Sequence, residues 1–339
     1  MTGILRIGGT CFSDSTPSAL SILNLDENEY GNRTVGVLPV NLPPLNFLEI
    51  VERWPLFRAL RELGPDECWR VMDELYEADL PHYFADPQNG DGRRKMVASA
   101  RKHMKLVPAL EDRDIEEMAA RYGTYGPRLQ KEVVFVLLWM RDHTTLFNEV
   151  VEVQGQDILD AALKIGNGVL AVPVHLGPSY VVGPMLAHEN PSTVVFNRIN
   201  FYGCKGKTFP NLDAEAVGLS SSSNIARVGI EALKTKRTFV IFPELDPRGV
   251  GQHHVRVPFL GTTVMVPSGP VIMSRIAKAP ILPISFLSNG NGTFVLKYHD
   301  LIEPSVNRKE DSAVVHTLWE SLNQIILEGP TEDWEIWLE

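Results

Sequence analysis

The sequence predicts an α/β protein, with a central, mostly parallel or mixed β-sheet flanked by helices and preceded by a mainly helical N-terminal region. After residue 166, short apolar runs alternate with segments of helical period, a pattern typical of a sheet with helices on its faces. Between residues 45 and about 163, apolar residues recur every three or four positions, as in helices. We therefore expect three regions: a strand-like segment at 1–44, a helical region at 45–150 that packs on the core, and an α/β core at 151–339.

The N-terminal half divides at its turn-forming residues. Short apolar pieces at 4–7, 19–23 and 34–38 are separated by Gly, Ser, Pro and Asn, and Pro43-Pro44 marks a break. The run 86–92, rich in Asn, Asp and Gly, is expected to be a loop between helices. The helices predicted for this half are 45–63, one from 65 onward, 93–106, 112–122, 127–142 and 156–164.

The C-terminal half contains the expected sheet. Its predicted strands are short, apolar and β-branched, and they are 169–174, 193–196, 238–242, 281–286 and 293–297. The helices expected between and after them are 223–235, 268–278 and 311–328.

Composition excludes several classes of protein. Forty-two acidic side chains against 32 basic ones give a formal charge of −10, which disfavours nucleic-acid binding. The longest apolar run, 133–140, is far shorter than the roughly 20 residues of a spanning helix, and the N-terminus lacks the features of a signal peptide. Three scattered cysteines, Cys11, Cys68 and Cys204, favour reduced thiols and a cytoplasmic protein.

Several catalytic and ligand-binding signatures are absent from the sequence. There is no Gly-x-Ser-x-Gly motif and no Gly-x-Gly-x-x-Gly after a strand. Gly206-Lys207-Thr208 resembles the end of a phosphate loop, but Phe201 stands where its first glycine belongs. The pair His253-His254 lacks the spacing and partners of a zinc site. We therefore expect no metal and no resident organic cofactor.

Two strand ends carry candidate chemistry. His175 follows the run 169–174 and precedes a Gly-Pro turn, and ligands bind at the carboxyl edge of open α/β sheets. A neutral imidazole there can act as a general base, with backbone N–H groups near Gly177 stabilising an oxyanion. The alternative is a histidine that only makes structural contacts at a strand end.

The second strand end is charged. The run 238–242 leads directly into Glu244, Asp246 and Arg248. Charges packed against a strand terminus are costly unless they pair or bind a polar group. A structural ion pair among these residues is the alternative to a functional site.

Together these segments resemble the lysophospholipid acyltransferase superfamily, and within it the lipid A biosynthesis (lauroyl/myristoyl) acyltransferase-like branch. The resemblance covers about 151–337. The matching blocks, in chain order, are Gly166-Asn167-Gly168, His175 with Gly177, Phe196-Asn197-Arg198, Phe242-Pro243-Glu244 with Asp246 and Arg248, 257–261, 279–283, and an ending from Pro330 to Trp337. That ending reads Pro-x-x-x-Trp-x-x-Trp and is similar to the family's Pro-x-x-Trp-x-Trp close.

The resemblance implies transfer of an acyl group from a thioester of acyl-carrier protein or coenzyme A to a hydroxyl or amine. His175 is then the base, Glu244 or Asp246 orients the histidine or the acceptor, and Arg198 and Arg248 hold an anionic part of a substrate. The family's acidic residue, five positions after the histidine, is here replaced by Tyr180. Three readings stay open: another carboxylate substitutes, His175 works unassisted, or catalysis has been lost and the protein only binds acyl groups.

Two further features bear on the partners. The family's N-terminal membrane helix has no counterpart here, so we expect a soluble or carrier-bound acceptor, in specialised-metabolite biosynthesis; a peripheral-membrane lipid acyltransferase is the alternative. Basic residues crowd the predicted helix 93–106, either as a solvated face or as a docking patch for an acidic carrier protein or for coenzyme A phosphates. They are Arg93, Arg94, Lys95, Arg101, Lys102 and Lys105.

Overall fold

We analysed a computed structural model of the chain, which describes residues 4–6, 37–39, 55–140, 145–197, 214–219, 224–244 and 253–337. Within the first 44 residues it contains an antiparallel pair, β1 (Ile4–Arg6) and β2 (Val37–Pro39). β1 lies inside the predicted apolar piece 4–7, and β2 overlaps the end of the piece 34–38. The third predicted piece, 19–23, lies outside the described residues.

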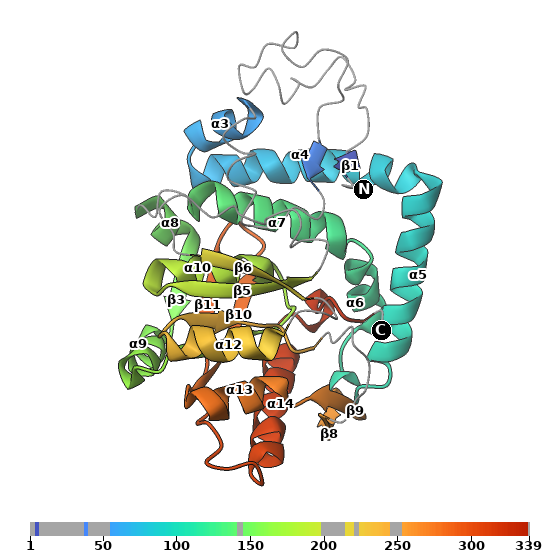
Figure 1. The fold of residues 1–339 in the computed structure, drawn as a ribbon. Helices are drawn as coiled ribbons and strands as arrows, with labels where there is room; N and C mark the ends of the chain where they lie inside the picture. The colour runs from blue at the N-terminus through green and yellow to red at the C-terminus, as the bar shows by residue number, and fades with distance from the viewer. Residues whose placement is uncertain are drawn as a thin grey trace, which may run out of the picture.

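The region that follows is helical, as predicted. Its helices lie above and beside the sheet in Figure 1, and α5 runs down one side of the core. Their bounds are α3 (Pro55–Glu62), α4 (Pro65–Ala85), α5 (Pro87–Met104), α6 (Ile115–Tyr122), α7 (Tyr125–Met140) and α8 (Thr145–Val150), with a 3₁₀ turn at Pro108–Leu110.

The prediction of a loop over 86–92 is wrong, because α5 begins at Pro87. The side chain of Asp86 accepts hydrogen bonds from the backbone N–H groups of Gln88 and Asn89, at 2.9 and 3.1 Å. An N-cap aspartate followed by proline in the first turn is a strong helix start. These two residues outweigh the low helix propensity of the Asn and Gly residues that follow.

The α/β fold class is confirmed. A seven-stranded sheet has the order β3-β11-β10-β4-β7-β5-β6, and its described neighbours pair in parallel except β10 and β11. The strands are β3 (Val151–Gln154), β4 (Val169–Pro173), β5 (Ser192–Asn197), β6 (Ala214–Leu219), β7 (Thr238–Val240), β10 (Ile281–Ser288) and β11 (Phe294–Tyr298). The helices of this region are α9 (Gln156–Ile165), α10 (Val182–Glu189), α12 (Ile225–Lys234), α13 (Gly269–Ala277) and α14 (Asp311–Glu328).

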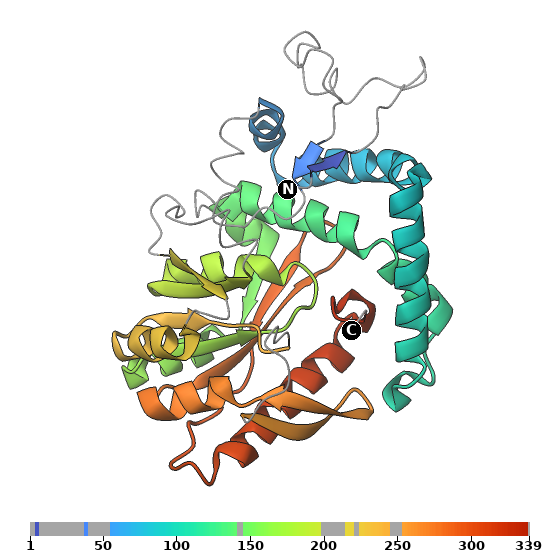
Figure 2. The same cartoon turned by 45° about the vertical axis from the view of Figure 1, so that its right-hand side comes forward.

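An antiparallel hairpin, β8 (His254–Phe259) and β9 (Thr262–Pro267), stands apart from the main sheet. Its turn residues Leu260 and Gly261 have φ values of 47° and 75°, as a two-residue type I′ turn requires. In Figure 2 this hairpin lies beside α14, on the side of the core that faces α5. The resemblance marks 257–261 as a family block, but the sequence pattern does not predict these two strands.

The core lies on both faces of the sheet. Along β4, all five residues are buried, and alternate side chains join two separate apolar clusters. One cluster contains the buried run Val133–Trp139 of α7, and the other contains the inner face of α14. Within the described parts of the chain, none of the helices combines the length and apolarity needed to span a lipid bilayer.

Candidate active site

The sheet register brings His175 and Glu244 together. β4 and β7 are parallel neighbours, and Ala171 is paired with Val240. His175 lies four residues after Ala171, and Glu244 lies four residues after Val240. Both therefore emerge at the carboxyl edge of the sheet, where open α/β folds bind ligands.

The two side chains form a buried hydrogen-bonded pair. His175 Nδ1 lies 2.9 Å from Glu244 Oε2, and the side chains are 8% and 1% exposed. The backbone N–H of His175 donates to Glu244 Oε1 at 2.9 Å, and Trp334 Nε1 donates to the same oxygen at 3.1 Å. Three donors thus satisfy a carboxylate that burial alone would destabilise.

This geometry determines the tautomer of His175. An ionised carboxylate only accepts hydrogen bonds, so the Nδ1 of a neutral His175 carries the proton and donates it to Glu244. Nε2 is then left with its lone pair, as a general base requires. Of the three readings of the missing family acid, this arrangement fits substitution by another carboxylate, namely Glu244.

Tyr180 does not take the place of the acid. Its hydroxyl donates a hydrogen bond to Glu335, and its ring meets the His175 ring edge-on, with centroids 6.0 Å apart. Burial, followed by the charge of Glu335, raises the pKa of Tyr180 well above its usual range, so the phenol stays protonated. The ring of Phe242 lies closer to the imidazole, at 4.4 Å between centroids, and forms one wall of the site.

The C-terminal segment is part of the site. The Gly177 N–H donates to the carbonyl of Asp333 at 3.1 Å, and the Glu335 N–H donates to the carbonyl of His175 at 2.9 Å. Between them Leu176 and Trp334 form an antiparallel bridge. Residues 333–335 therefore run along the histidine turn and fix its backbone.

The same hydrogen bonds bear on the predicted oxyanion site. Gly177 has φ of 61°, a left-handed conformation that favours glycine. Its N–H is engaged by Asp333, while the N–H groups of Leu176 and Ser179 donate to Val174 and Gly177. An oxyanion role for these groups would require one of these bonds to open, so the role stays a prediction.

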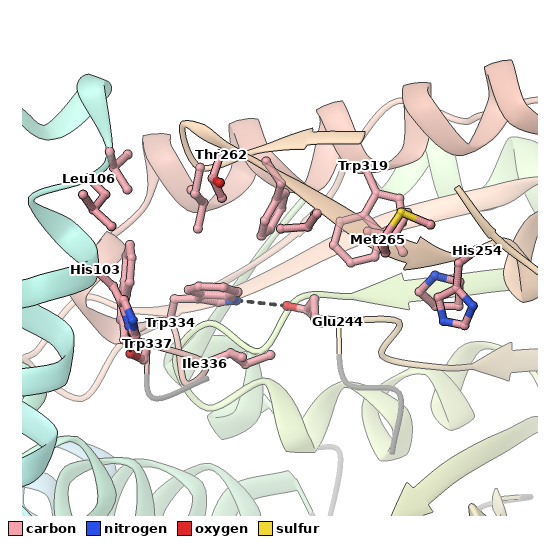
Figure 3. A pocket seen from close by; sticks show the side chains of 16 residues that line it. His103, Leu106, Glu244, His254, Thr262, Met265, Trp319, Trp334, Ile336 and Trp337 are labelled. Carbon is pink, nitrogen blue, oxygen red and sulfur yellow. Dashed lines mark hydrogen bonds between the residues drawn. The ribbon is translucent and has the colours of Figure 1, made fainter. Parts of the chain in front are cut away.

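A cavity of about 640 Å³ adjoins the Glu244 side of the pair (Figure 3). It lies between the β8–β9 hairpin, α14, the C-terminal segment and the end of α5, and most of its lining is apolar or aromatic. The lining residues are His103, Leu106, Val107, Glu244, His254, Phe259, Leu260, Thr262, Val264, Met265, Val266, Pro267, Trp319, Trp334, Ile336 and Trp337.

The predicted docking residues lie on α5, and some of them already have partners. Arg94 pairs with Asp91, and Arg101 pairs with Glu116 at 2.7 Å. Lys105, beyond the end of α5, also reaches Glu116, at 3.3 Å.

Three basic side chains of α5 have no ion pair among the described residues. Arg93 stacks over the ring of Phe84 at 4.6 Å, while Lys95 and Lys102 are exposed. Lys102 directly precedes His103, which lines the cavity. Any docking role therefore depends on fewer charges than the sequence predicted.

Three predicted site residues, Asp246, Arg198 and Arg248, lie outside the described residues. Sequence reasoning missed two residues of the site, Trp334 and Glu335. Both belong to the Pro-x-x-x-Trp-x-x-Trp ending, a block that the resemblance marks without giving it a role.

Comparison with known protein families gives a match over most of the chain. The family of bacterial lipid A biosynthesis acyltransferases matches residues 130–338, a range that includes His175, Glu244 and Trp334. No curated protein sequence matches this chain.

Proposed function

Because the chain belongs to the bacterial lipid A biosynthesis acyltransferase family, we propose that it moves an acyl group from a thioester to a hydroxyl or amine, with His175 as the general base. Nε2 takes the proton of the acceptor as the acceptor oxygen or nitrogen attacks the thioester carbonyl carbon. The tetrahedral intermediate collapses and expels the thiolate. The imidazolium then returns the proton, so the products are the acylated acceptor and the free thiol.

The His175–Glu244 pair beside an apolar cavity supports this proposal most strongly. The 1% exposed carboxylate of Glu244 stabilises the imidazolium that forms in the reaction, as the acid of a catalytic triad does. The cavity of about 640 Å³ offers an apolar space for the acyl chain on the far side of the same carboxylate. The proposed reaction uses no resident metal or organic cofactor.

Acyl-carrier protein or coenzyme A is the proposed donor. Lys95 and Lys102 are exposed on α5, whose C-terminal end contributes His103 to the cavity wall. A phosphopantetheine carrier bound at this face would lie near one end of the proposed acyl pocket. Complementary charge between these lysines and an acidic carrier would speed the encounter.

We propose that the acceptor is soluble or carrier-bound, as in the synthesis of a small acylated metabolite. The formal charge of −10 opposes binding to anionic bilayers, since basic residues supply that attraction. Flotation with anionic liposomes tests this part. Firm binding at physiological salt would favour a peripheral-membrane lipid acyltransferase.

The transfer itself is tested with acyl thioesters of graded length and a panel of hydroxyl and amine acceptors. We expect thiol release to be matched by acylated acceptor in mass spectra. Val266→Phe, which adds bulk at a cavity position, should raise KM for long-chain donors about tenfold and leave short-chain donors unchanged. Val306→Phe, at a surface position, is the control. Tight acyl binding without thiol release would instead favour a non-catalytic acyl-binding protein.

A further inference from the structure

Trp334 contacts the His175–Glu244 pair and also lines the cavity. Its indole N–H donates to Glu244 Oε1 at 3.1 Å, and its ring lines the cavity. Figure 3 shows the indole reaching toward Glu244, with the apolar cavity residues around it. It packs edge-to-face on Phe259 and Trp337, with ring centroids 5.7 and 5.1 Å away, and both of these residues also line the cavity.

The indole helps to orient Glu244. Of the two carboxylate oxygens, Oε1 is held by the His175 backbone N–H and by Trp334, which leaves Oε2 directed at His175 Nδ1. Removal of the indole donor leaves Oε1 with the backbone N–H alone. The carboxylate of Glu244 can then rotate more freely about χ3, because the χ3 torsion of glutamate has broad energy minima.

The backbone of the segment does not depend on this side chain. The Glu335 N–H to His175 carbonyl bond, the Gly177 N–H to Asp333 carbonyl bond and the bridge to Leu176 are all backbone contacts. A change of the Trp334 side chain that preserves its apolar ring therefore leaves the C-terminal segment in place. Its effect on the catalytic pair can be measured separately from its effect on folding.

We propose that Trp334 is a positioning residue that couples occupancy of the cavity to the His175–Glu244 pair, an inference that rests on the proposed acyl pocket. An acyl chain packed against the indole holds the ring where it donates to Glu244. Binding energy from the acyl chain in the cavity then helps to orient the His175–Glu244 pair at the thioester carbonyl. Such a contact raises kcat as well as lowering KM. Long-chain donors should therefore react with a higher kcat than short-chain donors.

Trp337 provides a matched control. It lines the same cavity, is similarly buried, and also donates one indole hydrogen bond, at 2.8 Å. Its acceptor is the carbonyl of Thr331 rather than Glu244. The substitutions Trp334→Phe and Trp337→Phe remove the same atoms from one pocket, and only the first removes a bond to the catalytic carboxylate.

The kinetic test compares lauroyl-CoA with butanoyl-CoA as donors. Trp334→Phe should lower kcat with lauroyl-CoA about tenfold to hundredfold, the effect of one lost hydrogen bond to a buried charge, and abolish the chain-length dependence of kcat. Trp337→Phe should keep that dependence. If wild type and Trp334→Phe show the same ratio of kcat values for the two donors, the coupling is refuted.

A spectroscopic test needs no turnover. The Nδ1 proton of His175, hydrogen-bonded to a carboxylate, should give a downfield proton signal in ¹⁵N-histidine-labelled protein, assigned by its loss in His175→Gln. The unreactive thioether dodecyl-CoA should shift this signal in wild type and Trp337→Phe but not in Trp334→Phe. An unchanged signal in wild type, or an equal shift in Trp334→Phe, would overturn the inference.

The two tests separate this inference from the proposed function. Suppose that dodecyl-CoA shifts the His175 signal in wild type and Trp337→Phe but not in Trp334→Phe, and that no thioester is turned over. The coupling through Trp334 then stands and the acyltransferase proposal fails. If thioesters are turned over but Trp334→Phe behaves as wild type in both tests, acyl transfer stands and the coupling fails.

Discussion

Replacement of Glu244 by glutamine should be more damaging than its similar size and shape suggest. Oε1 of Glu244 accepts from two N–H groups, those of the His175 backbone and the Trp334 indole, at 2.9 and 3.1 Å. A glutamine must keep its carbonyl oxygen there, because the flipped amide would leave two buried donors unpaired at about 1–3 kcal/mol each. Its NH₂ group then faces His175 Nδ1, where Glu244 Oε2 lies at 2.9 Å in the native protein.

The consequence is the wrong tautomer of His175. With an amide donor at Nδ1, that nitrogen becomes an acceptor and the proton moves to Nε2, which can no longer act as a base. If the proton returns to Nδ1, the Nδ1–H of His175 and the NH₂ group of the glutamine face each other, and both are donors. The glutamine also lacks the negative charge that stabilises the imidazolium of His175. An amide in place of the orienting acid of a serine-protease triad lowers kcat about 10⁴-fold, or about 5 kcal/mol, and we expect a loss of similar size here.

Glu244→Ala provides the comparison. It removes the acceptor without imposing a tautomer, so His175 can still present a basic Nε2. We expect a loss of about 10²-fold, smaller than that of Glu244→Gln. Glu335→Gln is the control, because a glutamine carbonyl can still accept the hydrogen bond of Tyr180.

The assay is thiol release from an acyl thioester under saturating donor, with the melting temperature of each variant as a check on folding. A folded Glu244→Gln protein with more than a tenth of wild-type kcat would refute the tautomer argument. So would a Glu244→Ala protein that is less active than Glu244→Gln.

Three further predictions concern stability. Asp333→Asn breaks a largely buried pair with Arg128, whose Nη2 lies 2.6 Å from Oδ1. The free energy of unfolding in urea titrations should fall by about 3 kcal/mol, and a loss below about 1 kcal/mol would contradict this. Gly168→Ala should cost about 2 kcal/mol or more by the same measurement, since Gly168 has φ of 67° and an added Cβ would lie 2.5 Å from the carbonyl oxygen of Arg237. Burial, with a smaller contribution from a neighbouring lysine, lowers the pKa of His299 to about 4. The unfolded chain therefore binds a proton that the folded chain does not, and the free energy of unfolding should fall by roughly 1–2 kcal/mol from pH 6.5 to pH 4, a fall that His299→Gln should reduce.

The fold class and the position of the site could be predicted from the sequence, because both depend on local patterns. Buried strands appear as apolar runs, and His175 and Glu244 each follow such a run closely. Their contact depends on β7 lying beside β4 although β5 and β6 come between them in the chain. Strand order is a property of the whole sheet, so the sequence offered Glu244 and Asp246 as equal candidates.

The contributions of Trp334 and Glu335 could not be derived from local patterns. Glu335 accepts from Tyr180, which stands 155 positions earlier in the chain, and no periodicity connects two such segments. β6 was missed for a different reason. Its sequence Ala-Glu-Ala-Val-Gly-Leu lacks the apolar, β-branched run by which buried strands are found, and pairing with β5 forms the strand instead.

We propose His175 as the general base of an acyl transfer. The most direct test is the rate at which acylated acceptor forms in wild type and in His175→Ala, followed by mass spectrometry under single-turnover conditions. We predict that the variant keeps its melting temperature and loses about 10³-fold in rate. Equal rates in the two proteins would contradict the claim.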